Sequence, residues 1–177
     1  QRVYTRDEAT AAALRVRGIK VATYLGNPVM DGLVAEPLVK RTGPGHVVIA
    51  LLPGSRGYAD QSVALMTEAV HELARLLDPG VEVSALVAWT RADVPEPPTG
   101  WARGESPRGV RGDGRVLATW EQGRARVMWV ENAFAAVLAA ADAVLGTAGT
   151  ANEQAAGLGL PVVAFPVPPF YGSAFLE

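Results

Sequence analysis

The sequence predicts an α/β fold built on a doubly wound parallel sheet, and three observations lead to this fold class. Residues 46–52 and 81–88 are runs of strand length rich in apolar residues, as expected for parallel strands covered on both faces. Between them, apolar residues recur with helical period over residues 58–77. A strand, a helix and a strand joined by short turns predict a right-handed parallel crossover, the unit of a Rossmann-like sheet.

The N-terminal part predicts a short appendage to this domain. Residues 5–8 (TRDE) fit a capping box for a helix that continues over 9–17, and Gly18 is placed to close it. A short strand over 19–25 and a short helix or linker over 29–39 are expected to follow. Because Gly and Pro are concentrated in 42–45, we expect residues 1–44 to be the end of a preceding domain with its linker, and 45–177 to be the α/β domain.

The remaining elements complete the predicted sheet. After a loop rich in Pro, Gly and Arg over 91–114, residues 115–120 and 125–130 are expected to pair as a hairpin. Asn132 is the expected N-cap of an Ala-rich helix. The other expected elements are the helix over 133–141, a strand over 142–145, a turn over 146–150, a helix over 151–158, a strand over 160–165 and the start of a helix over 173–177.

Composition excludes several classes of protein. The 177 residues are 49% hydrophobic, enough for a sizeable core, and no apolar stretch is long enough to span a membrane. The absence of cysteine excludes disulfides, a thiol nucleophile and Cys-ligated zinc, and two histidines argue against a His-based metal centre. A net charge of −2, and tryptophans that do not alternate with basic residues, argue against nucleic-acid binding. We expect no metal and no cofactor.

Candidate ligand-binding residues lie in loops that leave the carboxyl ends of expected strands, where open parallel sheets bind ligands. Three such loops, 53–57, 146–150 and 166–172, are rich in Gly, Pro, Ser or Thr, so their backbone N–H groups can approach an anion closely. Arg56 would add a bidentate positive charge for phosphate, and Glu153 would accept hydrogen bonds from a ribose diol. The candidate residues are Gly54, Ser55, Arg56, Gly149, Thr150 and Glu153.

Ordinary structural roles stay open for the same residues. The sequence Pro-Gly-Ser can be a plain strand-to-helix turn, and a Glu near a helix N-terminus is favoured by the helix dipole alone. Neither loop has the Gly-Lys-Ser/Thr ending of a Walker A motif, and residues 146–150 do not satisfy G-x-G-x-x-G. An ATPase or an NAD enzyme is therefore disfavoured.

Together these segments resemble lipid-A-disaccharide synthases. The resemblance covers about residues 19–166, with a divergent stretch over 91–130, and rests on segments in the family's order: 26–31 (GNPVMD), 51–56 (LLPGSR), 141–153 (ADAVLGTAGTANE) and 159–163 (GLPVV). It implies the C-terminal, donor-binding half of a GT-B glycosyltransferase. Asn27 stands where the family usually has His. The Glu of the family's turn either stands one position earlier here, as Glu153, or is replaced by Gln154.

The resemblance implies a donor-binding domain for a nucleotide sugar of the UDP-GlcNAc class, in an inverting glycosyltransferase of the cell envelope. The catalytic residues and the acceptor are unknown; the family's usual acceptor is a lipid A precursor, and a lipid-linked acceptor is left open for this chain. An acceptor-binding domain would precede residue 1, so the chain alone is expected to be inactive. The expected location is cytoplasmic, with peripheral contact to the inner face of the membrane left open. The alternatives are a UDP-sugar epimerase domain and a non-catalytic nucleotide-binding or regulatory module.

Overall fold

The computed structural model describes residues 2–39, 43–55, 57–105, 114–147 and 149–166. The chain divides into two compact units, Gln1–Leu33 and Val34–Glu177. This division lies earlier than the boundary expected between residues 44 and 45. Leu38, which precedes that boundary, is 1% exposed, and its backbone N–H donates to the Ala136 carbonyl of the second unit. The segment from Val34 to Val39 therefore packs with the α/β unit.

The first unit contains a two-stranded parallel sheet and one helix. Its elements are β1 (Val3–Tyr4), α1 (Glu8–Val16), β2 (Ala22–Thr23) and a 3-10 turn, η1 (Pro28–Met30). The predicted closure of α1 by Gly18 is confirmed, because Gly18 has φ +93° and donates to the Arg15 carbonyl. The strand expected over 19–25 is shorter, and only its centre pairs with β1.

The predicted capping box at the start of α1 is wrong. Asp7 is the N-cap, and its Oδ1 accepts from the Thr10 backbone N–H at 2.7 Å. Thr5, the expected cap, donates its hydroxyl to the Asp7 carbonyl instead. A carboxylate two residues later satisfies the same orphan N–H groups and carries a negative charge that the helix N-terminus favours.

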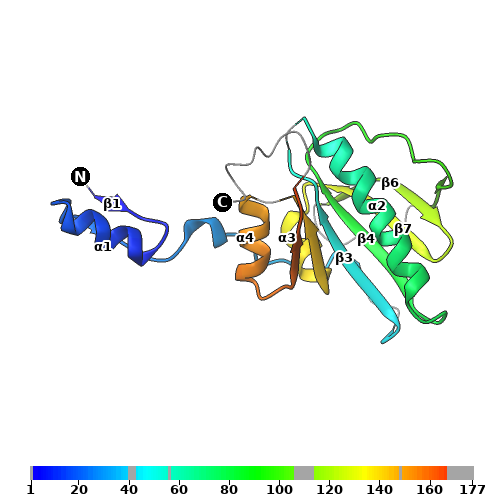
Figure 1. Cartoon of the computed structure of the whole chain (residues 1–177), viewed down its shortest axis with the longest axis horizontal. Coiled ribbons are helices and arrows are strands. Elements are labelled where there is room, and N and C mark those ends of the chain that lie inside the picture. Colours follow the sequence, from blue (N-terminus) through cyan, green and yellow to red (C-terminus); the bar gives the residue numbers. More distant parts are fainter. Residues whose placement is uncertain (1, 40–42, 56, 106–113, 148, 167–177) are drawn as a thin grey trace. The chain divides into compact units, whose positions relative to one another are not determined.

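The second unit is a mostly parallel sheet with helices on both faces (Figure 1), which confirms the predicted α/β class. Its elements are β3 (His46–Leu52), α2 (Ala59–Leu76), β4 (Glu82–Trp89), β5 (Ala102–Arg103), β6 (Arg115–Gln122), β7 (Ala125–Glu131), α3 (Phe134–Ala140), β8 (Ala143–Gly146), α4 (Thr150–Gly157) and β9 (Val162–Ala164). Among the described residues the sheet has seven strands in the order β5-β6-β7-β4-β3-β8-β9.

The strand directions follow from the connections. Strands β7, β4, β3, β8 and β9 are parallel to one another, and the predicted hairpin places β6 antiparallel to β7. Val83, Ala85 and Val87 of β4 face the core beneath α2, whereas Leu86 faces the core beneath α3 and α4. The period-2 alternation of a strand thus supplies two cores, as expected for a sheet covered on both faces. This arrangement is compatible with a Rossmann-like fold.

The predicted N-cap of the Ala-rich helix is also wrong. Helix α3 begins at Phe134 after Ala133, which makes no side-chain cap hydrogen bond. Asn132 instead has φ +55°, a left-handed conformation that Asn tolerates better than most residues. Asn132 therefore turns the chain out of β7 rather than capping the helix. The helix expected over 173–177 lies outside the described residues.

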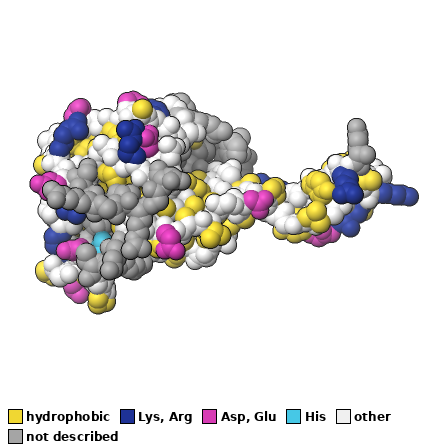
Figure 2. All heavy atoms as spheres, turned by 180° about the vertical axis from the view of Figure 1, so that it is seen from behind, with side chains coloured by type: hydrophobic (Ala, Val, Ile, Leu, Met, Phe, Trp, Pro, Cys, Tyr) yellow, Lys and Arg dark blue, Asp and Glu magenta, His cyan; other side chains and the backbone are white. Residues whose placement is uncertain are grey.

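The surface of the second unit is electrostatically mixed in the view of Figure 2, where acidic and basic side chains lie next to one another. Exposed ion pairs of this unit include Arg75 with Glu72 and Arg126 with Glu121. Within the described part of the chain, no helix is both long and apolar enough to cross a lipid bilayer.

Candidate functional site at the carboxyl edge of the sheet

The order in which strands are added to the sheet reverses between β3 and β8. These strands are parallel neighbours, with Leu51 opposite Leu145 and Leu52 opposite Gly146. From β3 the chain passes through α2 to β4 on one side, and from β8 it passes through α4 to β9 on the other. This is the topological switch point of an open α/β sheet, the place where such sheets bind ligands.

Two of the three loops predicted to bind ligand, those after β3 and β8, meet at this point. The Thr147 backbone N–H donates to the Leu52 carbonyl at 3.2 Å, and the buried Thr147 hydroxyl lies 3.4 Å from the same oxygen. Gly54 has φ +80°, and a Cβ atom built on it would lie 3.7 Å from Thr147 Oγ1. The loops after β3 and β8 are therefore in contact.

Gly149 determines how α4 begins. It has φ +99° and ψ −170°, a region that is essentially restricted to glycine. Its carbonyl accepts hydrogen bonds from the backbone N–H groups of Asn152 (3.0 Å) and Glu153 (3.3 Å). The loop thus turns directly into the helix, and the exposed Thr150 and Glu153 lie in its first turn.

The predicted site residues on these two loops differ in their exposure to solvent. Ser55 on one loop, and Gly149, Thr150 and Glu153 on the other, are exposed, while Gly54 is half-buried. Arg56 lies outside the described residues, as do residues 167–172 of the third predicted loop. The residue just before the third loop lies at the end of β8, because the Phe165 backbone N–H donates to the Gly146 carbonyl at 3.1 Å.

Sequence reasoning missed Asn152 as a residue of this edge. Its side-chain amide lies against the backbone of Gly146, and within the described structure both its Nδ2 and Oδ1 are buried without a hydrogen-bond partner. A buried amide without partners is costly, so its position calls for a functional or structural reason. The sequence carries no distinct signal for it, because α4 is a short helix with a single buried residue, Ala155.

The chemistry of this edge suits an anion held by neutral donors. Helices α2 and α4 both start here, and helix N-termini carry partial positive charge on their free N–H groups. The hydroxyls of Ser55 and Thr150 add donors from the two loops. Over the ranges that the structure describes, no group of three or more acidic, His or Cys side chains is placed to hold a metal ion.

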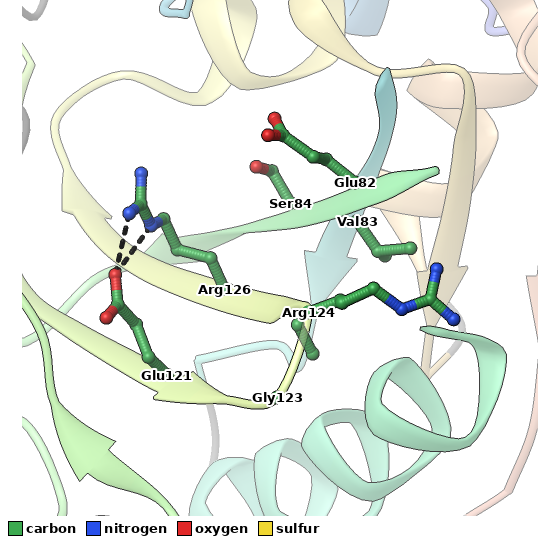
Figure 3. A pocket seen from close by; sticks show the side chains of 8 residues that line it. Glu82, Val83, Ser84, Glu121, Gly123, Arg124 and Arg126 are labelled. Carbon is green, nitrogen blue, oxygen red and sulfur yellow. Dashed lines mark hydrogen bonds and ion pairs between the residues drawn. The ribbon is translucent and has the colours of Figure 1, made fainter. Parts of the chain in front are cut away.

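Among the described residues, each unit also has a cavity of its own. One, of about 320 Å³, is at the amino end of β4 beside the β6–β7 turn (Figure 3). The other, of about 490 Å³, lies within the first unit and is lined by residues that include Tyr4, Leu25, Asn27 and Asp31.

Comparison with known protein families and with curated proteins yields no match for this chain.

Proposed function

We propose that the second unit is the donor-binding domain of an inverting glycosyltransferase of the GT-B type, related to lipid-A-disaccharide synthase, and that it binds a UDP-GlcNAc-like nucleotide sugar. The single observation that carries this proposal is the hydrogen bond from the Thr147 backbone N–H to the Leu52 carbonyl, which joins the loops after β3 and β8 at the switch point. The loops that resemble the family's donor-binding segments are the loops that meet there. Nucleotides bind α/β sheets at such a position.

In the proposed mechanism, the second unit binds and stabilises the leaving group, UDP. An acceptor hydroxyl attacks the anomeric carbon, a base in the acceptor-binding domain removes its proton, and UDP departs with inversion. Backbone N–H groups of the loops after β3 and β8, together with Arg56, would stabilise the negative charge that develops on the departing diphosphate. Glu153, in the first turn of α4, would accept hydrogen bonds from the ribose hydroxyls.

Calorimetric titration of the 177-residue chain with UDP tests the proposal. We expect saturable binding of UDP, weaker binding of uridine because it lacks the diphosphate, and no transfer of sugar by this chain alone. ADP serves as the control ligand, because it carries the same diphosphate on a different base. Absence of UDP binding would overturn the assignment of a donor site. Robust sugar transfer by the chain alone would overturn the need for an acceptor-binding domain.

A further inference from the structure

An ion pair joins the first turn of α2 to the loop after β4. Arg91 follows Trp89, the last residue of β4, by two positions, and its Nη2 forms an ion pair with Asp60 Oδ1. Asp60 lies in the first turn of α2, which begins at Ala59. The pair therefore links two segments at the carboxyl edge of the sheet, next to the loop after β3.

An aromatic ring holds Arg91 from a second side. Its guanidinium carbon lies 4.5 Å from the centroid of the buried Trp89 ring, a cation–π arrangement. The Trp89 indole N–H donates to the Asp93 carbonyl at 2.7 Å, which fixes the loop around the ring. The Asp93 carboxylate makes only a longer contact, with Arg91 Nε and Asp93 Oδ1 3.6 Å apart, and its side chain is 80% exposed. The guanidinium thus has a defined position beside Asp60.

Asp60 carries two groups of opposite effect at the start of α2. The hydrogen bonds within the helix begin with Ser62, whose N–H donates to the Tyr58 carbonyl at 2.9 Å. The backbone N–H groups before it, including that of Asp60, have no acceptor within the helix and can face an anion. The carboxylate of the same residue would repel that anion and compete with it for the positive end of the helix.

The ion pair determines the side of the helix start on which this carboxylate lies. Strand β3 lies between β4 and β8, so the loops after β4 and β8 are on opposite sides of it. Because Arg91 belongs to the loop after β4, the pair draws the Asp60 carboxylate toward β4. That side is away from the place where the loops after β3 and β8 are joined.

We propose that Arg91 is a positioning residue for the donor site, which neutralises Asp60 and holds its carboxylate away from the bound diphosphate. This inference rests on the proposed function, because the diphosphate is that of the nucleotide sugar. Arg91 acts through Asp60 and does not itself contact the diphosphate, since Asp60 and Trp89 engage its guanidinium.

A double-mutant cycle, with UDP and uridine as calorimetric ligands, tests this role. Asp60→Asn removes the carboxylate charge, so it should strengthen UDP binding about two- to fivefold and leave uridine binding unchanged. Arg91→Met leaves the Asp60 charge uncompensated, so it should weaken UDP binding by about the same factor. In the Asp60→Asn background, Arg91→Met should have little effect, because the charge that Arg91 compensates is gone.

Asp93→Asn is the matched control, because it removes a carboxylate that also faces Arg91 but does not belong to α2. We expect it to change the affinity for UDP little. Asp60 is exposed, so Asp60→Asn should fold and keeps the test decisive even if Arg91→Met does not fold.

Three results would overturn the positioning role while UDP still binds. Arg91→Met could weaken UDP equally in both backgrounds, which would indicate direct contact with the diphosphate. Asp60→Asn could fail to strengthen UDP, or could affect UDP and uridine equally. Absence of UDP binding in the unmodified chain and in every variant would instead overturn the proposed function, and this inference with it.

Discussion

The side chain of Asn152, in the first turn of α4, lies directly on the backbone of Gly146, the last residue of β8. A Cβ atom built on Gly146 would overlap Asn152 Oδ1 and would come within 2.8 Å of Asn152 Cγ. The strand therefore has to end in glycine for α4 to begin where it does. This contact holds the loop with Gly149 and Thr150 over the carboxyl edge of the sheet.

Replacing Gly146 with alanine should destabilise the second unit. The added methyl group meets Asn152 in a packed region, and overpacking of this kind costs about 1–3 kcal/mol. The double variant Gly146→Ala/Asn152→Ala removes the obstructing amide, so it should recover most of the loss. Urea unfolding followed by the fluorescence of the buried Trp120 and Trp129 measures both free energies.

Gly80→Ala is the matched control for this experiment. Gly80 has open space where a Cβ atom would lie, so its substitution should be nearly neutral. Equal effects of the two glycine substitutions, or no recovery in the double variant, would contradict the assigned contact between Gly146 and Asn152.

Arg124 joins the turn between β6 and β7 to the end of α2. Its guanidinium donates to four carbonyl oxygens at the end of α2 and in the turn that follows, those of Ala74, Leu77, Asp78 and Val81. The last carbonyls of a helix have no partner within the helix, and a positive charge is favoured there. Arg124 therefore acts as a C-terminal cap supplied from a distant part of the chain.

Arg124→Met should destabilise the second unit by roughly 1.5–3 kcal/mol, the range for hydrogen bonds that involve a charged group. Arg124→Lys should restore little of this, because an ammonium group cannot span several carbonyls as a planar guanidinium does. The control is Arg126→Met, which removes an exposed ion pair worth about 0.2–1 kcal/mol. Urea unfolding of the three variants gives their free energies of unfolding. If Arg124→Lys is as stable as the unmodified chain, the cap does not depend on the planar geometry of the guanidinium.

Local patterns predicted most of the elements. The apolar run over 46–52 corresponds to β3 at both ends, and the periodic stretch over 58–77 contains α2. These signals are strong because every residue of the run contributes to them. N-caps depend on the backbone angles of one residue and on competition between neighbours, which explains why the expected caps Thr5 and Asn132 gave way to Asp7 and Ala133.

The sequence predicted the individual loops of the candidate site but not which of them lie next to each other in the fold. Glycine-rich turns after strands pointed to Gly54 and Gly149, but the pairing of β3 with β8 that joins their loops is a non-local choice. The contact of Arg124 with α2 joins residues 47 positions apart, and that of Asn152 with Gly146 depends on the backbone angles of Gly149 in the turn between β8 and α4. No spacing along the chain encodes them, so sequence reasoning could not find them.

Asp7 makes the stability of α1 depend on pH. The Thr10 backbone N–H, followed by the Thr10 hydroxyl, holds the pKa of the Asp7 carboxyl below its ordinary value of 3.8. Because the folded pKa is lowered, the cap stabilises the helix above the unfolded pKa, and the effect is lost as the pH falls through the folded pKa.

A carbon-detected NMR titration of the Asp7 carboxyl measures this pKa. We expect a midpoint below 3.8 in the unmodified chain and a higher midpoint in Thr10→Ala, which loses the hydroxyl but keeps the backbone N–H. A midpoint that does not respond to Thr10→Ala would show that the hydroxyl does not stabilise the carboxylate.

Arg56→Ala should weaken binding of UDP more than binding of uridine. The proposed role of Arg56 is to contact the diphosphate, and each charge-assisted hydrogen bond that is lost costs on the order of 1.5–3 kcal/mol. Arg75→Ala is the control, because Arg75 is an exposed arginine that pairs with Glu72 near the end of α2. Calorimetric titration with UDP and with uridine measures both affinities. Equal losses of affinity for the two ligands would show that Arg56 does not contact the diphosphate.

Glu153→Gln should discriminate between ribose and deoxyribose. A carboxylate in the first turn of α4 can accept hydrogen bonds from both ribose hydroxyls, whereas an amide of the same shape accepts more weakly and presents donors. The loss of charge near the helix N-terminus costs only about 0.3–1 kcal/mol of stability, so the melting temperature should change little. Calorimetry should therefore show weaker binding of UDP and a much smaller change for 2′-deoxy-UDP. If the ratio of the two affinities is unchanged, Glu153 serves the helix and not the nucleotide.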